Sequence, residues 1–165
     1  MTDRIVTTND TATGTGIAQA TPWHLWVIGG LSLLFNFGGI FDYLMTQTRA
    51  DFYMSNFSQE QLDYFYGFPA WMDAFWALGV WGAFAGSVLL LLRNRFAFHA
   101  FIVALIGLAG SSLYQFGVAD VPESLATPGF MIFTAIVWAI TLALAIYARA
   151  MTKRGVLRVP AAITA

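Results

Sequence analysis

The sequence contains no cysteine and little charge, and each shortage excludes a class of protein. Without a thiol there is no disulfide, no cysteine nucleophile, no iron–sulfur cluster and no lipid-modified cysteine. Charged residues make up 10% of the chain, whereas an average soluble domain carries about 25%. The net charge of −1 gives no basic surface, so we expect no nucleic-acid partner.

In place of charge, the chain has four long apolar runs. Hydrophobic residues make up 58% of it, and the charged residues lie mostly between the runs. The runs cover residues 23–46, 70–92, 96–118 and 129–150. Each is close to the roughly 20 residues that cross the hydrocarbon core of a bilayer. The sequence therefore predicts an all-α membrane protein with four transmembrane helices, whose first partner is the lipid bilayer.

The ends of the chain differ from this bundle, which we place at residues 22–151. Residues 1–21 are rich in threonine and alanine with little to bury, so we expect a disordered cytoplasmic tail there. The first apolar run begins at Trp23 and is long enough to span, so we expect it to remain as the first helix and not to be cleaved as a signal peptide. Residues 152–165 are expected to form a basic cytoplasmic tail.

The distribution of basic residues predicts the orientation. Four spans place both ends of the chain and the 93–95 loop on one side, and that side holds seven of the eight lysines and arginines. Only Arg49 lies on the other side, among five acidic residues. Because basic loops stay in the cytoplasm, we expect a multi-pass protein of the bacterial inner membrane with both termini cytoplasmic.

The outer loop over residues 47–68 is unusually aromatic, with seven Phe and Tyr residues between positions 52 and 68. Ser58 followed by Gln61 is typical of a capping box at a helix start. We therefore expect a short amphipathic helix in this first outer loop. The sequence leaves open whether it covers a ligand pocket or anchors the chain among the lipid headgroups.

The second apolar run begins with Pro69, which suits the first position of a helix. Trp71 and Trp76 are typical of a membrane interface. Glycines at suitable spacing allow close approach of a neighbouring backbone, either within the bundle or in a dimer. The candidates for such helix packing are Gly82, Gly86, Gly39 and Gly110.

Polar residues inside the apolar runs are the candidates for a binding site. Asp73, Asn36 and Gln115, with Asp42, are expected to converge near the outer half of the bundle, because such groups are costly in lipid and often functional. Trp76 and Tyr43 are the aromatic candidates beside them. The alternative is that Asp73 reaches interfacial water near the start of its helix and that Asn36 only bonds a neighbouring helix.

A weak internal repeat relates the two halves of the bundle. Residues 35–38 read Phe-Asn-Phe-Gly and residues 114–117 read Tyr-Gln-Phe-Gly, while Pro69 and Pro128 open the second and fourth runs. This pattern predicts two parallel-related hairpins, an arrangement known in transporters. Ile132 stands where the first hairpin has Asp73, so any site would be asymmetric.

Several chemical functions have no support in the sequence. His24 and His99 lie near cytoplasmic helix ends, but a haem would need two facing histidines, and His24 is about 100° from the small face of its helix. No three-ligand metal set, phosphate-binding glycine loop or nucleophile–base pair is present. We expect no cofactor, no metal and no enzymatic activity.

The motifs also carry a family resemblance over residues 23–118. They are Phe41 to Thr48, Phe57 to Trp71, Trp76 to Gly82 and Leu89 to Arg95. In these segments the chain resembles an uncharacterised family of small four-helix proteobacterial inner-membrane proteins. Some members are automatically labelled "sugar transporter", and that label implies no mapped binding residues.

These observations favour a non-enzymatic integral membrane protein. It would act as an accessory subunit of a larger membrane complex, or as a bundle that binds a lipid or small apolar ligand. The alternative, which the resemblance implies, is a small-solute transporter of the sugar type, acting through self-association. A transporter is favoured less because its helices would be broken near the midplane, whereas the prolines here lie at or just before helix starts.

Overall fold

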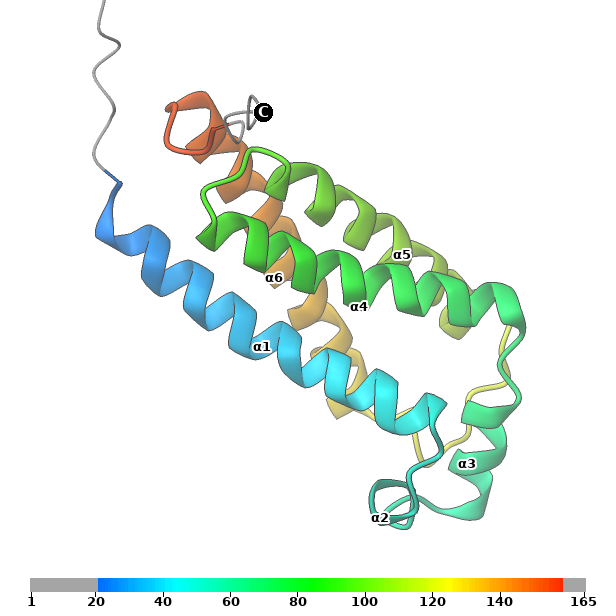
Figure 1. Cartoon of the computed structure of the whole chain (residues 1–165). Coiled ribbons are helices and arrows are strands. Elements are labelled where there is room, and N and C mark those ends of the chain that lie inside the picture. Colours follow the sequence, from blue (N-terminus) through cyan, green and yellow to red (C-terminus); the bar gives the residue numbers. More distant parts are fainter. Residues whose placement is uncertain (1–20, 159–165) are drawn as a thin grey trace, which may run out of the picture.

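The computed structural model describes residues 21–158, and this part of the chain is helical (Figure 1). Four helices are long and apolar enough to cross a membrane, and two short helices lie between the first pair. The long helices are α1 (Trp23–Gln47), α4 (Ala70–Leu91), α5 (Ala97–Gly117) and α6 (Pro128–Lys153). The short ones are α2 (Asp51–Met54) and α3 (Gln59–Tyr66). The predicted fold class is confirmed.

Most of the long helices' surface is apolar and outward-facing. Leu34 on α1, Leu113 on α5 and Ile146 on α6 are 71%, 64% and 61% exposed. A water-soluble protein of this size would not expose so many large side chains, because burying one stabilises a protein by about 1.5–3 kcal/mol. In a bilayer the same side chains face lipid. The architecture is therefore that of a multi-pass membrane protein.

The helix starts lie at the expected residues, with one difference. Pro69 is the N-cap of α4 and not its first helical residue, whereas Pro128 does occupy the first position of α6. The Thr127 hydroxyl caps α6 by accepting from the Phe130 amide at 3.3 Å. The predicted capping box of Ser58 and Gln61 is confirmed at the start of α3.

The helices pack in chain order, α1 on α4, α4 on α5 and α5 on α6, while α1 and α6 have little direct contact. The α4–α5 pair is the closest, because glycines face backbone there. A Cβ at Gly82 would lie 2.9 Å from the Ala104 amide nitrogen, and one at Gly107 would lie 2.2 Å from that of Gly79. Gly86 and Gly110 instead receive the rings of Phe101 and Phe75.

One end of the bundle is filled by a tightly packed core. Leu25, Leu90, Phe101 and Ala148 are fully buried there. The chain after α6 returns to this core, because Val156 and Leu157 are buried in it. The Arg158 amide donates to the Arg93 carbonyl at 2.8 Å, which ties this segment to the loop between α4 and α5. Residues 152–158 of the predicted basic tail are thus packed against the bundle.

The two ends of the bundle differ in charge. We call the end with the start of α1, the 93–95 loop and the end of α6 the basic end. It carries Arg93, Arg95, Arg149, Lys153, Arg154 and Arg158, and residues 21–158 place no acid there. The opposite end, with α2, α3 and the 118–127 loop, is the acidic end. The predicted tail over residues 1–20 lies outside the described residues.

The internal repeat is looser than its sequence pattern indicates. α1 packs on α4 and α5 packs on α6, as two hairpins require. However, Asn36 lies near the middle of α1, whereas Gln115 lies in the last turn of α5. The two motifs therefore occupy different depths, so the matching residues are not equivalent positions in the bundle.

Candidate functional site

A cavity of about 740 Å³ occupies the half of the bundle nearest the acidic end. All four long helices line it, together with residues of α2, α3 and the segments beside them. The apolar side chains that line it are mainly aromatic: Phe35, Tyr53, Phe57, Tyr64, Phe65, Phe68, Trp76, Phe130 and Phe133. Its volume falls within the roughly 300–1,000 Å³ of small-molecule sites.

Asn36 supplies the deepest amide on the α1 wall of the cavity, and its orientation is determined by its neighbour. The Ser87 hydroxyl on α4 donates to the Ala83 carbonyl at 3.0 Å, so its oxygen is left to accept. The Asn36 Nδ2 group donates to that oxygen at 2.9 Å. The side-chain oxygen of Asn36, a cavity-lining residue, has no partner among residues 21–158.

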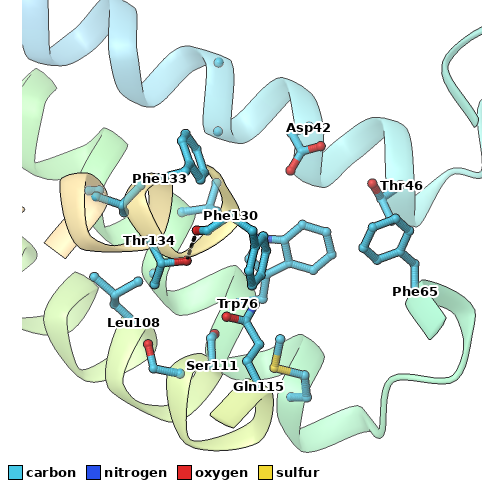
Figure 2. A pocket seen from close by; sticks show the side chains of 18 of the residues that line it. Asp42, Thr46, Phe65, Trp76, Leu108, Ser111, Gln115, Phe130, Phe133 and Thr134 are labelled. Carbon is cyan, nitrogen blue, oxygen red and sulfur yellow. Dashed lines mark hydrogen bonds between the residues drawn. The ribbon is translucent and has the colours of Figure 1, made fainter. Parts of the chain in front are cut away.

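Asp42 is the only ionisable carboxylate that lines the cavity, and it points from α1 toward the space in front of Trp76 and Phe130 (Figure 2). The Tyr53 hydroxyl donates to its Oδ1 atom at 2.5 Å. Burial and this hydrogen bond raise the pKa of Tyr53 to about 12. Tyr53 therefore keeps its proton, and the hydrogen bond, across the physiological pH range.

The segment over residues 52–68 forms an aromatic lid over the cavity, and we use this name for it below. Rings of Tyr53, Phe57, Phe65 and Phe68 contact one another in sequence, with centroids 5.4–6.0 Å apart. Phe68 then meets Trp76 of α4 at 6.0 Å. Edge-to-face contacts of this kind contribute about 0.5–1.5 kcal/mol each. These four rings of the loop form one wall of the cavity.

The Tyr64 hydroxyl is an unsatisfied polar group in the lid. It is buried and has no hydrogen-bond partner in the described part of the chain. Burial and the nearby Tyr114 raise the pKa of Tyr64 to about 12. An unpaired buried hydroxyl costs about 1–3 kcal/mol, so ring packing and not hydrogen bonding holds Tyr64 in place.

Two of the side chains that line the cavity also face the outside of the bundle. Phe35 on α1 and Phe133 on α6 both line it, yet they are 38% and 58% exposed. The same two helices are in contact at the basic end, where the His24 Nδ1 atom and the Tyr147 hydroxyl lie 2.6 Å apart.

The structure brings together four of the six predicted site residues. Asn36, Asp42, Trp76 and Gln115 line the cavity, but Asp73 and Tyr43 do not. Asp73 instead accepts a hydrogen bond from the Gln47 amide at 3.0 Å. On α4 it is Met72 and Trp76, four residues apart, that face the cavity, and Asp73 is rotated about 100° from Met72. The expected convergence of Asp73 with Asn36 and Gln115 is wrong.

Tyr43, predicted for the site, and Gly39, predicted for helix packing, both lie near the cavity but not in the expected roles. Tyr43 lies behind Trp76, with its ring edge-on to the indole at 5.1 Å. Gly39, predicted to pack a helix, lines the cavity, and nothing lies within 4 Å of where its Cβ would be. The three other glycines predicted for packing, Gly82, Gly86 and Gly110, do face close neighbours.

The two histidines do not share a site. His24 is engaged with Tyr147, and His99 is exposed beside the rings of Phe96 and Phe98. Within residues 21–158, no group of three His, Asp or Glu side chains is placed to hold a metal ion.

Sequence reasoning missed the polar residues of α5 and α6 that line the cavity, namely Ser111, Ser112, Thr134 and Thr141. Three of their hydroxyls donate to a carbonyl four residues earlier, as Thr134 does to Phe130 at 3.0 Å (Figure 2). Ser112 instead accepts from the Trp138 indole at 3.0 Å. For α6 the sequence did contain a signal for a shared polar face, because Thr134 and Thr141 lie seven residues apart and therefore on the same side of a helix.

No family model, curated protein or solved structure matches this chain. Fold and site therefore define its class by themselves: a four-span membrane protein with an aromatic-lined cavity in one half of the bundle.

Proposed function

We propose that this protein binds, without chemically transforming it, a lipophilic small molecule that enters its cavity from the bilayer. The observation that carries the proposal is the cavity itself, because its volume of about 740 Å³ suits a small molecule and its apolar lining is mainly aromatic. An apolar ligand body would pack against these rings.

The polar groups of the cavity indicate a ligand with a small polar part. The Asn36 side-chain oxygen and the amide of Gln115 make no hydrogen bond to described residues. Such groups in an otherwise aromatic wall orient a ligand, since they are poorly satisfied until it binds. A lipid-like molecule with one polar end suits this wall better than a sugar, which would need many more hydrogen-bonding partners.

Binding is favoured over passage by the other half of the bundle. The core around Leu25, Phe101 and Ala148 fills the basic end. All four long helices are continuous, whereas transporter sites are typically built on helices broken near the midplane. Movement of solute through the chain would require this core to separate.

The proposal is tested by photolabelling of the full chain in lipid nanodiscs. The probe is a neutral long-chain alcohol that carries a diazirine on its alkyl chain, and its adducts are mapped by mass spectrometry. We expect saturable adducts on cavity residues such as Leu108 and Val137, which excess unlabelled alcohol suppresses. Adducts on lipid-facing residues such as Leu34 and Ile146 should rise linearly with probe.

A pair of variants on α1 supplies the control. Gly39→Leu places a side chain in the cavity, while Gly30→Leu places the same side chain on an exposed surface outside it, and neither Cβ meets an atom within 4 Å. We expect saturable labelling to be lost in the first variant and kept in the second. Labelling that never saturates, or that ignores Gly39→Leu, would contradict the proposal.

A further inference from the structure

We infer that the cavity prefers a lipophilic cation, such as a quaternary ammonium or protonated amine with an apolar body, whose charge lies against Asp42. This inference rests on the proposed function and adds the ligand's charge. Among residues 21–158, the cavity lining contains one acidic residue and no lysine, arginine or histidine. An anion placed there would be repelled and would find no counter-charge.

The Asp42 carboxylate is available to a ligand. Its Oδ1 atom accepts from Tyr53, and its Oδ2 atom has no hydrogen-bond partner among residues 21–158. The nearest base in sequence, Arg49, has its guanidinium 4.3 Å over the Tyr66 ring. An unpaired carboxylate near an apolar cavity attracts a cation more strongly than one in bulk water, because the local dielectric constant is lower.

Aromatic rings beside Asp42 provide the second element of a cation site. The ring centroid of Tyr53, whose hydroxyl donates to Asp42, lies 5.6 Å from that of Phe57. The centroids of Phe57 and Phe65 lie 5.4 Å apart. All three side chains line the cavity. Ring faces attract organic cations within about 6 Å, and such rings are how proteins recognise quaternary ammonium groups. A carboxylate next to a row of rings is therefore matched to a charge that is spread over a bulky group.

The negative charge of the acidic end also favours a cationic ligand over an anionic one. Of the described residues, Arg49 is the only base on it, against these acids: Asp42, Asp51, Glu60, Asp63, Asp73, Asp120 and Glu123. A surface of one sign raises the local concentration of the opposite ion. This contribution is general, however, so the test has to separate it from a specific contact with Asp42.

Two probes of the same shape and opposite charge make the test: tetraphenylphosphonium and tetraphenylborate. Equilibrium binding of each radiolabelled ion is measured with protein-containing nanodiscs, and binding to empty nanodiscs is subtracted. We expect the phosphonium to bind saturably, and Asp42→Asn to weaken this binding at least tenfold. The asparagine keeps an acceptor for Tyr53, so the lid contact survives the change.

Asp73→Asn is the matched control, because it removes the same charge from the same end of the bundle without touching the cavity. We expect it to change phosphonium binding less than twofold. Equal effects of the two variants, or saturable binding of the borate as tight as that of the phosphonium, would overturn the inference. If saturable alcohol labelling persists in that case, the cavity still binds ligands and only the charge preference is wrong.

Discussion

At the scale of single residues, two tyrosines of the lid differ in the hydrogen bonding of their hydroxyl groups. Tyr53 donates its hydrogen to the Asp42 carboxylate, whereas the Tyr64 hydroxyl is buried without a partner in the described residues. A hydrogen bond to a charged group contributes about 1.5–3 kcal/mol, while an unpaired buried hydroxyl costs a comparable amount. The same chemical change at the two positions should therefore act in opposite directions.

We expect Tyr53→Phe to lower the free energy of unfolding by about 1 kcal/mol, the smaller side of the range, because Tyr53 is only half-buried. Tyr64→Phe should leave stability unchanged or raise it by up to about 1 kcal/mol. Denaturant titration of each variant in one detergent measures both. A loss at Tyr64 as large as that at Tyr53 would show that its hydroxyl does have a partner.

The raised pKa values extend this comparison to alkaline pH. A pKa of about 12 in the folded state, against 10 for a free tyrosine, means that the folded state keeps protons that the unfolded chain loses above pH 10. Stability is therefore independent of these groups below pH 10 and declines as the pH rises from 10 through about 12. The stability of the wild type should fall relative to that of the Tyr53→Phe/Tyr64→Phe double variant across this interval, and a constant difference would contradict the assignment.

At the scale of elements, the α4–α5 pair depends on glycine. Gly107 approaches the Gly79 backbone so closely that an added Cβ would lie 2.2 Å from its nitrogen and 2.6 Å from the Phe75 carbonyl oxygen. Backbone cannot move aside as a flexible side chain does, so the helices would have to separate. Close approach of this kind is what holds helices together in lipid, where no hydrophobic force drives them into contact.

We expect Gly107→Ala to destabilise the bundle by at least about 2 kcal/mol, because overpacking a well-packed contact typically costs 1–3 kcal/mol. Gly30→Ala is its control, since Gly30 is an exposed helical glycine with nothing within 4 Å of its Cβ position. That change should be neutral or stabilise by up to about 1 kcal/mol. Thermal unfolding in detergent compares them, and equal melting temperatures would exclude the α4–α5 contact described here.

At the scale of the whole molecule, the two ends differ in both charge and packing. The basic end is closed by a core and by the segment after α6, and the acidic end holds the cavity and its lid. Because basic loops remain in the cytoplasm, we propose that the cavity faces the outer leaflet. A ligand would then enter from that leaflet or from the outer solution.

This orientation is tested with single cysteines, since the chain has none of its own. Asn56 lies in the lid and Asn94 lies in the loop at the basic end, and replacing either leaves the charge distribution unchanged. We expect Asn56→Cys to react with a membrane-impermeant thiol reagent in intact spheroplasts, and Asn94→Cys to react only after lysis. The reverse pattern would place the cavity in the inner leaflet.

The sequence by itself determined the features that depend on local pattern. Apolar runs of membrane length predict the four spans to within a few residues, because length and hydropathy alone decide whether a helix can cross lipid. Ser58 and Gln61 predict the start of α3 through a contact that spans three residues. The division into a basic and an acidic end likewise follows from counting charges between spans.

Only the tertiary structure decided which polar residues share the cavity. A residue faces the bundle or not according to the rotation of its helix, and adjacent positions differ by about 100°. That rotation depends on contacts with other helices, such as Gly107 against Gly79, which no local pattern encodes. For this reason Asp42, which sequence reasoning ranked below Asp73, is the carboxylate in the cavity. The pairing of Asn36 with Ser87 was equally out of reach, because it joins residues on separate helices.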